Sequence, residues 1–143
     1  MIENFIGSYD NVLSSVECQE IIEYFKIINK QNKVISQDQY TSAPAHLTRK
    51  DDTVFMLYPD VIAFPATIPV LQPFVNNFWK IYSEEYAKEF TVLRSTVKHG
   101  FHMIRLQKTP IGGGFHTWHF ENFNLETSSR LVAFQLYLND VEE

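Results

Sequence analysis

The sequence contains one short motif whose residue types could bind a metal, His119-Phe120-Glu121. On a β-strand, residues two apart point to the same face, so His119 and Glu121 would converge while Phe120 faces away. An imidazole and a carboxylate suit a divalent metal such as Fe(II), and they make two of the three ligands of a 2-His-1-carboxylate facial triad. The motif therefore suggests a metal site, although so short a pattern also arises by chance.

The segments on both sides of the motif favour the metal-site hypothesis. Pro110 and three glycines, Gly112 to Gly114, precede it and predict a turn that needs backbone freedom. An aromatic-rich strand would then carry the motif. After a polar loop over residues 122–129, residues 130–138 begin with an arginine and continue almost wholly apolar, which predicts a strand buried on both faces.

The composition is that of one ordinary globular domain spanning residues 1–143. A formal net charge of -5 gives no global basic footprint for nucleic acid. Cys18 is the only cysteine, which excludes an intrachain disulfide and favours a reducing, cytoplasmic location. The N-terminus does not look like a signal peptide, and no apolar stretch is long enough to span a bilayer, so no membrane partner is expected.

Two amphipathic helices are predicted ahead of the motif. Ser14 and Glu17 form a capping-box pattern, and apolar residues recur behind them at helical spacing, which predicts a helix over residues 15–30. The polar segment from Asn29 to Asn32 is predicted to end this helix. The second pattern predicts a helix over residues 69–88, with a proline in its first turn. Trp79 and Tyr82 could be taken for an aromatic binding face, but packing against a sheet explains such a stripe better.

Short strands complete the predicted organisation. Residues 2–13 predict a strand and a turn with Phe5, Ile6 and Val12 as anchors. A further short strand is expected near residues 34–35, and residues 54–58 predict a strand or a buried turn. Residues 101–107 alternate between apolar and polar, as a half-buried strand does. Helices early and strands late predict an α+β fold, with a helical layer on one face of an antiparallel sheet.

Together, the glycines, His119-x-Glu121 and the segment from Arg130 to Val141 resemble the 2-oxoglutarate/Fe(II)-dependent dioxygenases. More narrowly, they resemble the prolyl-4-hydroxylase-like branch found in bacteria and in phages. Residues 103–109, with Phe115 and Trp118, are similar to the phage-type pattern. The resemblance covers residues 100–143.

The resemblance implies a double-stranded β-helix, a cupin-like jelly roll, whose N-terminal helices buttress the major sheet. It implies His119 and Glu121 as iron ligands and places Phe115 and Tyr137 in the 2-oxoglutarate pocket. The implied reaction hydroxylates a C–H bond of a prolyl or other peptidyl side chain, or of a small molecule, with release of succinate and CO2. Fe(II), 2-oxoglutarate and O2 are the implied cofactor and co-substrates, with ascorbate a further candidate.

The sequence departs from the family pattern at its C-terminal side. The family's second histidine ligand, and the basic residue that pairs with 2-oxoglutarate, would both fall after residue 143. His116 would lie on the opposite strand face from His119, and His46, His99 and His102 stand where the family has no ligand. A truncated domain, or a split protein, is therefore expected. The 143 residues alone should bind iron poorly, catalyse little and expose unpaired strand edges.

Two other functions remain open. His116, His119 and Glu121 could form the zinc site of a hydrolase, although such pairs usually lie one helical turn apart on a helix. A non-catalytic β-sandwich that serves as a structural or interaction module is also compatible with the acidic, aromatic-rich composition. Metal dependence separates this module from both enzymes, and 2-oxoglutarate dependence separates the two enzymes.

Overall fold

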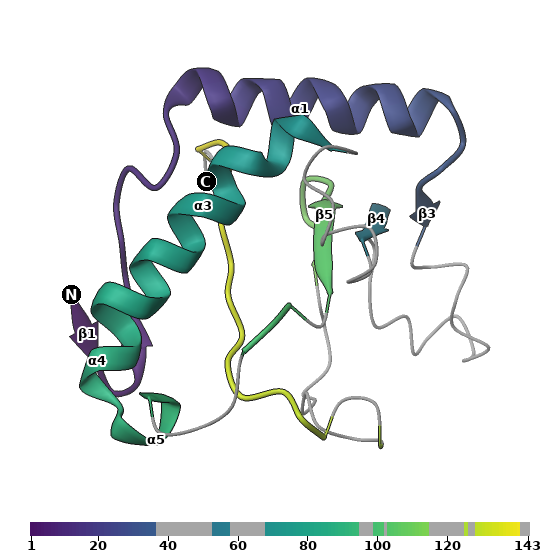
Figure 1. Cartoon of the computed structure of the whole chain (residues 1–143). Coiled ribbons are helices and arrows are strands. Elements are labelled where there is room, and N and C mark those ends of the chain that lie inside the picture. Colours follow the sequence, from purple (N-terminus) through teal and green to yellow (C-terminus); the bar gives the residue numbers. More distant parts are fainter. Residues whose placement is uncertain are drawn as a thin grey trace. The chain divides into compact units, whose positions relative to one another are not determined.

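The computed structural model describes residues 1–36, 53–57, 68–94, 99–101, 103–114, 125 and 128–140. Helices and strands alternate along the chain, and every strand pair in these residues is antiparallel (Figure 1). The chain divides into two compact units. The first comprises Met1–Tyr24, Asp60–Phe101 and Leu138–Glu143, and the second comprises Phe25–Pro59 and His102–Tyr137.

Helix α1 spans Ser15–Lys30, as its local signals predict. The capping box is present. The Ser14 backbone N–H and hydroxyl both donate to the Glu17 carboxylate at 2.7 Å, and the Glu17 backbone N–H donates to Ser14 Oγ at 3.3 Å. These bonds satisfy N–H groups that the first helical turn leaves without a partner.

The C-terminal end of α1 is closed by a Schellman motif. Asn32 adopts a left-handed backbone with φ of 55°, which asparagine tolerates better than most residues. The Asn32 amide donates to Asn29 O at 3.0 Å and the Lys33 amide donates to Ile28 O at 3.1 Å. The polar stretch predicted to end the helix therefore does so through a defined hydrogen-bond pattern.

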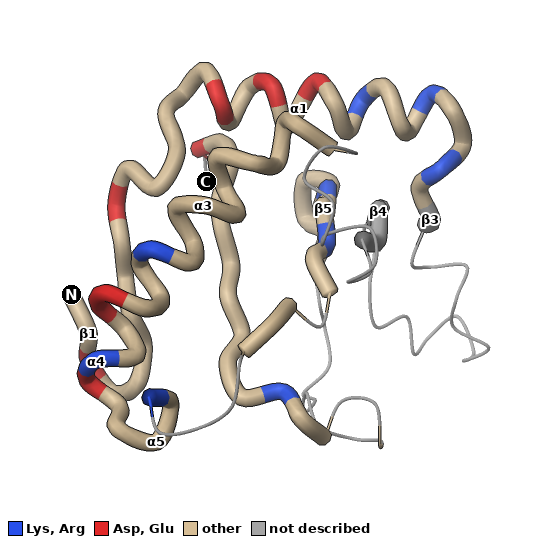
Figure 2. Tube along the Cα trace, viewed as in Figure 1, with Lys and Arg blue, Asp and Glu red and all other residues tan. Residues whose placement is uncertain are grey.

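The charges along α1 follow its dipole. Figure 2 shows acidic residues along the first half of the helix and basic residues along the second. This order stabilises a helix, because the N-terminal end carries partial positive charge and the C-terminal end partial negative charge. The charge pattern of α1 is thus explained by the helix itself and needs no binding partner.

The capping box makes helix stability depend on pH. Hydrogen bonds from the Ser14 backbone N–H, and then from its hydroxyl, hold the pKa of Glu17 below its ordinary value. A depressed carboxyl pKa contributes stability above the ordinary value, and this is lost as pH falls through the lowered pKa. Ser14→Ala should destabilise the protein by about 1 kcal/mol at neutral pH, measured by urea unfolding.

The loss in Ser14→Ala is expected to shrink as pH falls from neutral through the lowered pKa of Glu17, because protonation removes the carboxylate that accepts the Ser14 hydrogen bonds. Ser15→Ala, at the first helical position, is the matched control. We expect it to leave the free energy of unfolding nearly unchanged. Equal losses for the two serine variants would contradict the role of Ser14 as the cap.

The second long helix is continuous but changes its hydrogen-bonding pattern. It begins with the 3-10 turn η4, Pro69–Leu71, continues as α3, Gln72–Ile81, passes through the π-helical segment η5, Tyr82–Tyr86, and ends as α4, Ala87–Glu89. A short helix, α5, follows at Thr91–Arg94. The helix predicted for residues 69–88 is confirmed, but its π segment was not predicted.

A row of aromatic residues explains the π segment. Its members, spaced every four residues, are Phe74, Phe78, Tyr82, Tyr86 and Phe90. Neighbouring ring centroids lie 6.0, 6.0, 6.4 and 4.9 Å apart along the row. In an α-helix each four-residue step drifts by about 40°, whereas the wider π turn reduces this drift. The π segment therefore keeps Tyr82 and Tyr86 stacked.

Trp79 and Tyr82 pack within the first unit, not against a strand. The ring of Phe101 lies 4.8 Å from Phe78 and 5.0 Å from Trp79. Trp79 also meets Tyr82 edge to face at 5.7 Å. The prediction that these rings serve packing is supported, but in the described residues their partners come from the helix itself and from the chain that precedes β5.

Two small sheets are present in the described residues. Strands β1, Ile2–Glu3, and β2, Ile6–Gly7, form a hairpin. Strands β3, Ile35–Ser36, β4, Thr53–Leu57, and β5, Ile104–Lys108, form a sheet in the order β3-β4-β5. Ile104 and Leu106 of β5 are buried, and Arg105 and Gln107 are exposed. The predicted alternation is confirmed, but the strand begins three residues later.

Two sequence-based predictions are wrong. Phe5 and Ile6 are 76% and 69% exposed and are therefore not buried anchors; Leu13 is buried instead. Phe5 occupies the turn of a hairpin whose strands are two residues long, too short to bury it. The second error concerns residues 131–138, which form no strand, and there Leu131 is 66% exposed. Such a run becomes a buried strand only where neighbouring strands bond to it, and none in the described residues does.

The described residues thus form a mixed helix-and-strand structure with antiparallel sheets. They show two small sheets and no jelly roll, so the double-stranded β-helix remains a prediction. The single domain over residues 1–143 and the missing C-terminal part of the barrel also remain predictions. Within the described part of the chain, no helix is long and apolar enough to cross a membrane.

Candidate functional site

A strand and a turn precede the predicted metal-binding motif in the chain. After β5, the Gly113 amide donates to Pro110 O at 2.9 Å and closes the turn. Gly112 adopts a φ of 74°, and in the described residues beyond its chain neighbours no atom lies within 4 Å of where a Cβ would stand. Backbone conformation, not lack of space, therefore requires glycine at this position. The predicted sequence of strand and glycine turn is confirmed up to Gly114.

The motif itself lies outside the described residues. His119 and Glu121, the predicted iron ligands, fall there, as does Phe115, assigned to the 2-oxoglutarate pocket. His46, His102 and His116 also fall there. The structure neither brings the two ligands together nor separates them, so their convergence rests on the alternation of side chains along a strand.

Tyr137 is the one predicted pocket residue that the structure describes. It is 77% exposed, and its hydroxyl donates to Gln135 Oε1 at 3.1 Å. These two residues lie two apart in an extended segment, which brings their side chains to the same side. In this arrangement Tyr137 presents its ring to solvent, and its place in a 2-oxoglutarate pocket stays a prediction.

His99 is held by two hydrogen bonds of its own unit. Its Nε2 lies 3.0 Å from Leu93 O, and its Nδ1 lies 3.3 Å from the Tyr82 hydroxyl. A carbonyl only accepts, so Nε2 carries a proton and donates to Leu93 O. Both nitrogens are engaged, which gives His99 a structural role and fits its place outside the expected ligand set.

The described residues contain no group of three or more His, Cys, Asp or Glu side chains that could hold a metal. Four of the five histidines of the chain lie outside these residues, because only His99 is described. The proposed metal ligands are therefore the two residues of the motif, His119 and Glu121. One imidazole and one carboxylate fit Fe(II), as they fit other divalent metals that accept nitrogen and oxygen ligands.

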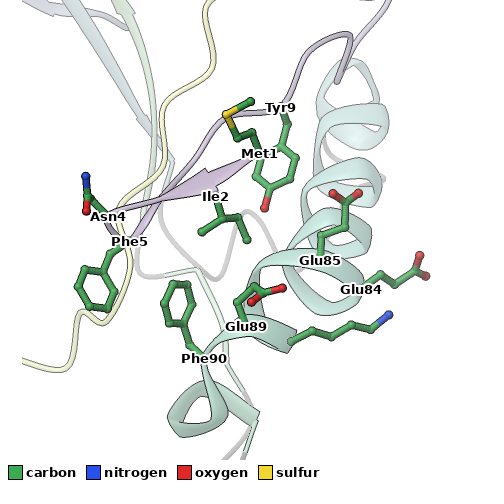
Figure 3. Close-up of a pocket in the computed structure, with 10 residues that line it drawn as sticks. Met1, Ile2, Asn4, Phe5, Tyr9, Glu84, Glu85, Glu89 and Phe90 are labelled. Atoms are coloured by element: carbon green, nitrogen blue, oxygen red, sulfur yellow. The ribbon is translucent and has the colours of Figure 1, made fainter.

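A groove in the first unit was not predicted. It has a volume of about 750 Å³ and lies between the N-terminal hairpin and the helix from Tyr82 to Phe90 (Figure 3). Apolar lining comes from Ile2, Phe5 and Phe90, and carboxylates come from Glu84, Glu85 and Glu89. The four-residue spacing of the aromatic residues, which continues from the helix to Phe90, is the sequence signal that could have indicated this groove.

Tyr9 lies in this groove with a buried hydroxyl. Its oxygen has no hydrogen-bond partner among the residues that the structure describes. Gly7 covers the ring so closely that a Cβ there would stand 2.8 Å from Tyr9 Cε2 and 2.9 Å from its hydroxyl. Burial, and then the negative charge of Glu85, raises the pKa of Tyr9. The hairpin therefore buries a polar group that it does not satisfy.

Comparison with known protein families, with curated proteins and with solved structures gives no match to this chain.

Proposed function

We propose that this chain carries the metal-binding motif of a 2-oxoglutarate- and Fe(II)-dependent dioxygenase. The observation that carries the proposal is His119-x-Glu121 directly behind a three-glycine turn. On a strand, these two side chains share a face, and their donor atoms match two of the three positions of a facial triad. The reaction proposed is hydroxylation of a C–H bond, with release of succinate and CO2.

The described residues ahead of the motif support this proposal. Strand β5 runs from Ile104 to Lys108 and leads through the turn at Pro110–Gly113 towards the motif. Gly112, with its positive φ, lets the chain reverse direction without steric strain. A strand that follows this turn would present His119 and Glu121 on one face.

The chain's own residues have limited and specific roles in this proposal. His119 and Glu121 hold the metal, and Phe115 and Tyr137 flank the co-substrate. Bound Fe(II) and 2-oxoglutarate, with O2, would supply the oxidising chemistry, while the protein supplies ligand geometry and excludes water. A third metal ligand is required in addition to these two side chains. Peptidyl side chains, prolyl among them, are the proposed substrate class.

The test is 2-oxoglutarate turnover with Fe(II), followed as succinate without added substrate. Two proteins are compared, the 143-residue chain and the chain with any residues its source gene encodes beyond Glu143. We expect activity in the extended protein, little in the 143 residues alone, and loss of activity in His119→Ala. His116→Ala is the matched control, because strict alternation places His116 on the opposite strand face.

Failure has three distinct forms. Zinc-dependent hydrolysis without 2-oxoglutarate turnover would favour the hypothesis that the chain is a zinc hydrolase. Absence of both turnover and Fe(II) binding in the extended protein would reject the enzyme and favour a non-catalytic interaction module. Activity that survives His119→Ala would reject the proposed ligand while leaving the reaction class standing.

A further inference from the structure

The N-terminal hairpin is attached to the long helix by few contacts. The Tyr86 hydroxyl donates to Phe5 O at 2.7 Å, and the Phe5 and Phe90 rings stack with centroids 5.4 Å apart. Figure 3 shows these two rings side by side at the edge of the groove. The hairpin ends are closed by two bonds, from Ser8 N to Met1 O at 2.8 Å and from Met1 N to Ser8 O at 2.9 Å.

Several features of the docked hairpin oppose this attachment. Asn4 and Phe5 have φ values of 48° and 68°, and a bulky residue such as phenylalanine rarely adopts this backbone. Gly7 and its neighbours bury the Tyr9 hydroxyl, which has no partner in the described part of the chain. The two strands are two residues long, and isolated two-stranded hairpins are marginal in water. Release of the hairpin would relieve the strain and rehydrate the hydroxyl.

The docking contacts depend on the π segment of the helix. The Ala87 amide donates to Tyr82 O, five residues earlier, which is the π-type bond. Tyr86 is the last residue of this segment and Phe90 follows four residues later. The backbone of the π segment therefore sets the orientation of both rings. If the segment relaxed to a regular α-helix, the turn of the helix after it would rotate and carry Tyr86 and Phe90 away from Phe5.

We propose that residues 1–7 form a strap that docks onto the long helix and releases from it, and that docking and the π segment stabilise each other. In the docked state the strap forms one wall of the groove. Release removes that wall and exposes Tyr86, Phe90 and the Tyr9 hydroxyl. This inference concerns the first unit and does not depend on the proposed dioxygenase activity.

The test measures amide exchange of Ser8 and the hydrogen bond from Ala87 to Tyr82 in the full chain by NMR. Tyr86→Phe removes the hydroxyl that holds Phe5 O. We expect Ser8 to exchange about tenfold faster, the size expected for one lost hydrogen bond. The scalar coupling across the Ala87–Tyr82 bond should weaken in the same variant. Tyr137→Phe removes a hydroxyl that donates to Gln135 of its own segment, and it should change neither quantity.

A second variant tests the coupling from the helix side. Deletion of the exposed Glu84 removes one residue from the π segment and favours a regular α-helix. We expect Ser8 protection to fall by at least as much as in Tyr86→Phe while the helix content is kept. Unchanged Ser8 exchange in Tyr86→Phe would overturn the strap. Faster Ser8 exchange with an unchanged Ala87–Tyr82 coupling, or full Ser8 protection after the deletion, would overturn the mutual stabilisation.

Discussion

Replacement of His119 by alanine is expected to weaken Fe(II) binding at least about 100-fold. Loss of a residue that merely orients a ligand already lowers metal affinity about 10–100-fold, and His119 is proposed to be a ligand itself. The measurement is anaerobic titration with Fe(II), in whichever form of the protein turns over 2-oxoglutarate. Because affinity is read directly, a defect in substrate binding cannot imitate the result.

Two substitutions of Glu121 with different chemistry can be compared in the same Fe(II) titration. Glu121→Gln removes the negative charge with little change in size, whereas Glu121→Asp keeps a carboxylate on a shorter side chain. We expect the aspartate variant to retain more Fe(II) affinity than the glutamine variant, since charge and oxygen ligation both favour the metal. His116→Ala is the control and should bind nearly as the parent does. Affinities in the His119 and His116 variants that both equal the parent's would show that neither position is a ligand.

Ile21→Ala is expected to lower the free energy of unfolding by about 2–5 kcal/mol. Ile21 is 2% exposed on the inner face of α1, so the shortened side chain loses burial and leaves a cavity. Unfolding in urea, followed by helix circular dichroism, would measure the loss. So large a change is a substantial part of the stability of a small domain.

Ile27→Ala is the matched control, because it makes the same replacement on the same helix. Ile27 is 53% exposed, and alanine has the higher helix propensity. We expect its free energy of unfolding to stay within about 0.5 kcal/mol of the parent. A similar loss at both positions would mean that α1 does not bury the face seen in the structure.

Helix α1 shows how much local sequence can predict. The Ser14 and Glu17 pair marked its start, apolar spacing marked its length, and the polar stretch from Asn29 to Asn32 marked its end. All three are confirmed, because caps and periodicity act through residues that are near in sequence. The alternation of β5 was predicted for the same reason. His119-x-Glu121 was also identified from local sequence, but the convergence of the two side chains at a metal site stays a prediction.

The parts that were not predicted depend on contacts between distant residues. The π segment at Tyr82–Tyr86 brings a row of rings to Phe5, which lies about eighty positions earlier in the chain. Phe5 itself was taken for a buried anchor, although its burial depended on a hairpin too short to cover it. The apolar run at residues 131–138 was taken for a buried strand. Apolar composition predicts burial only if a neighbouring surface covers the segment.

Local signals were thus sufficient for the bounds of α1, the face of β5, the glycine turn and the choice of His119 and Glu121 as a candidate ligand pair. Long-range packing determined the contact of Phe5 with Tyr86 and Phe90, the buried Tyr9 hydroxyl and the absence of a strand over residues 131–138. The physical difference is one of range. Capping, helical periodicity and backbone preference act over a few residues, whereas burial and strand pairing depend on segments that only the folded chain brings together.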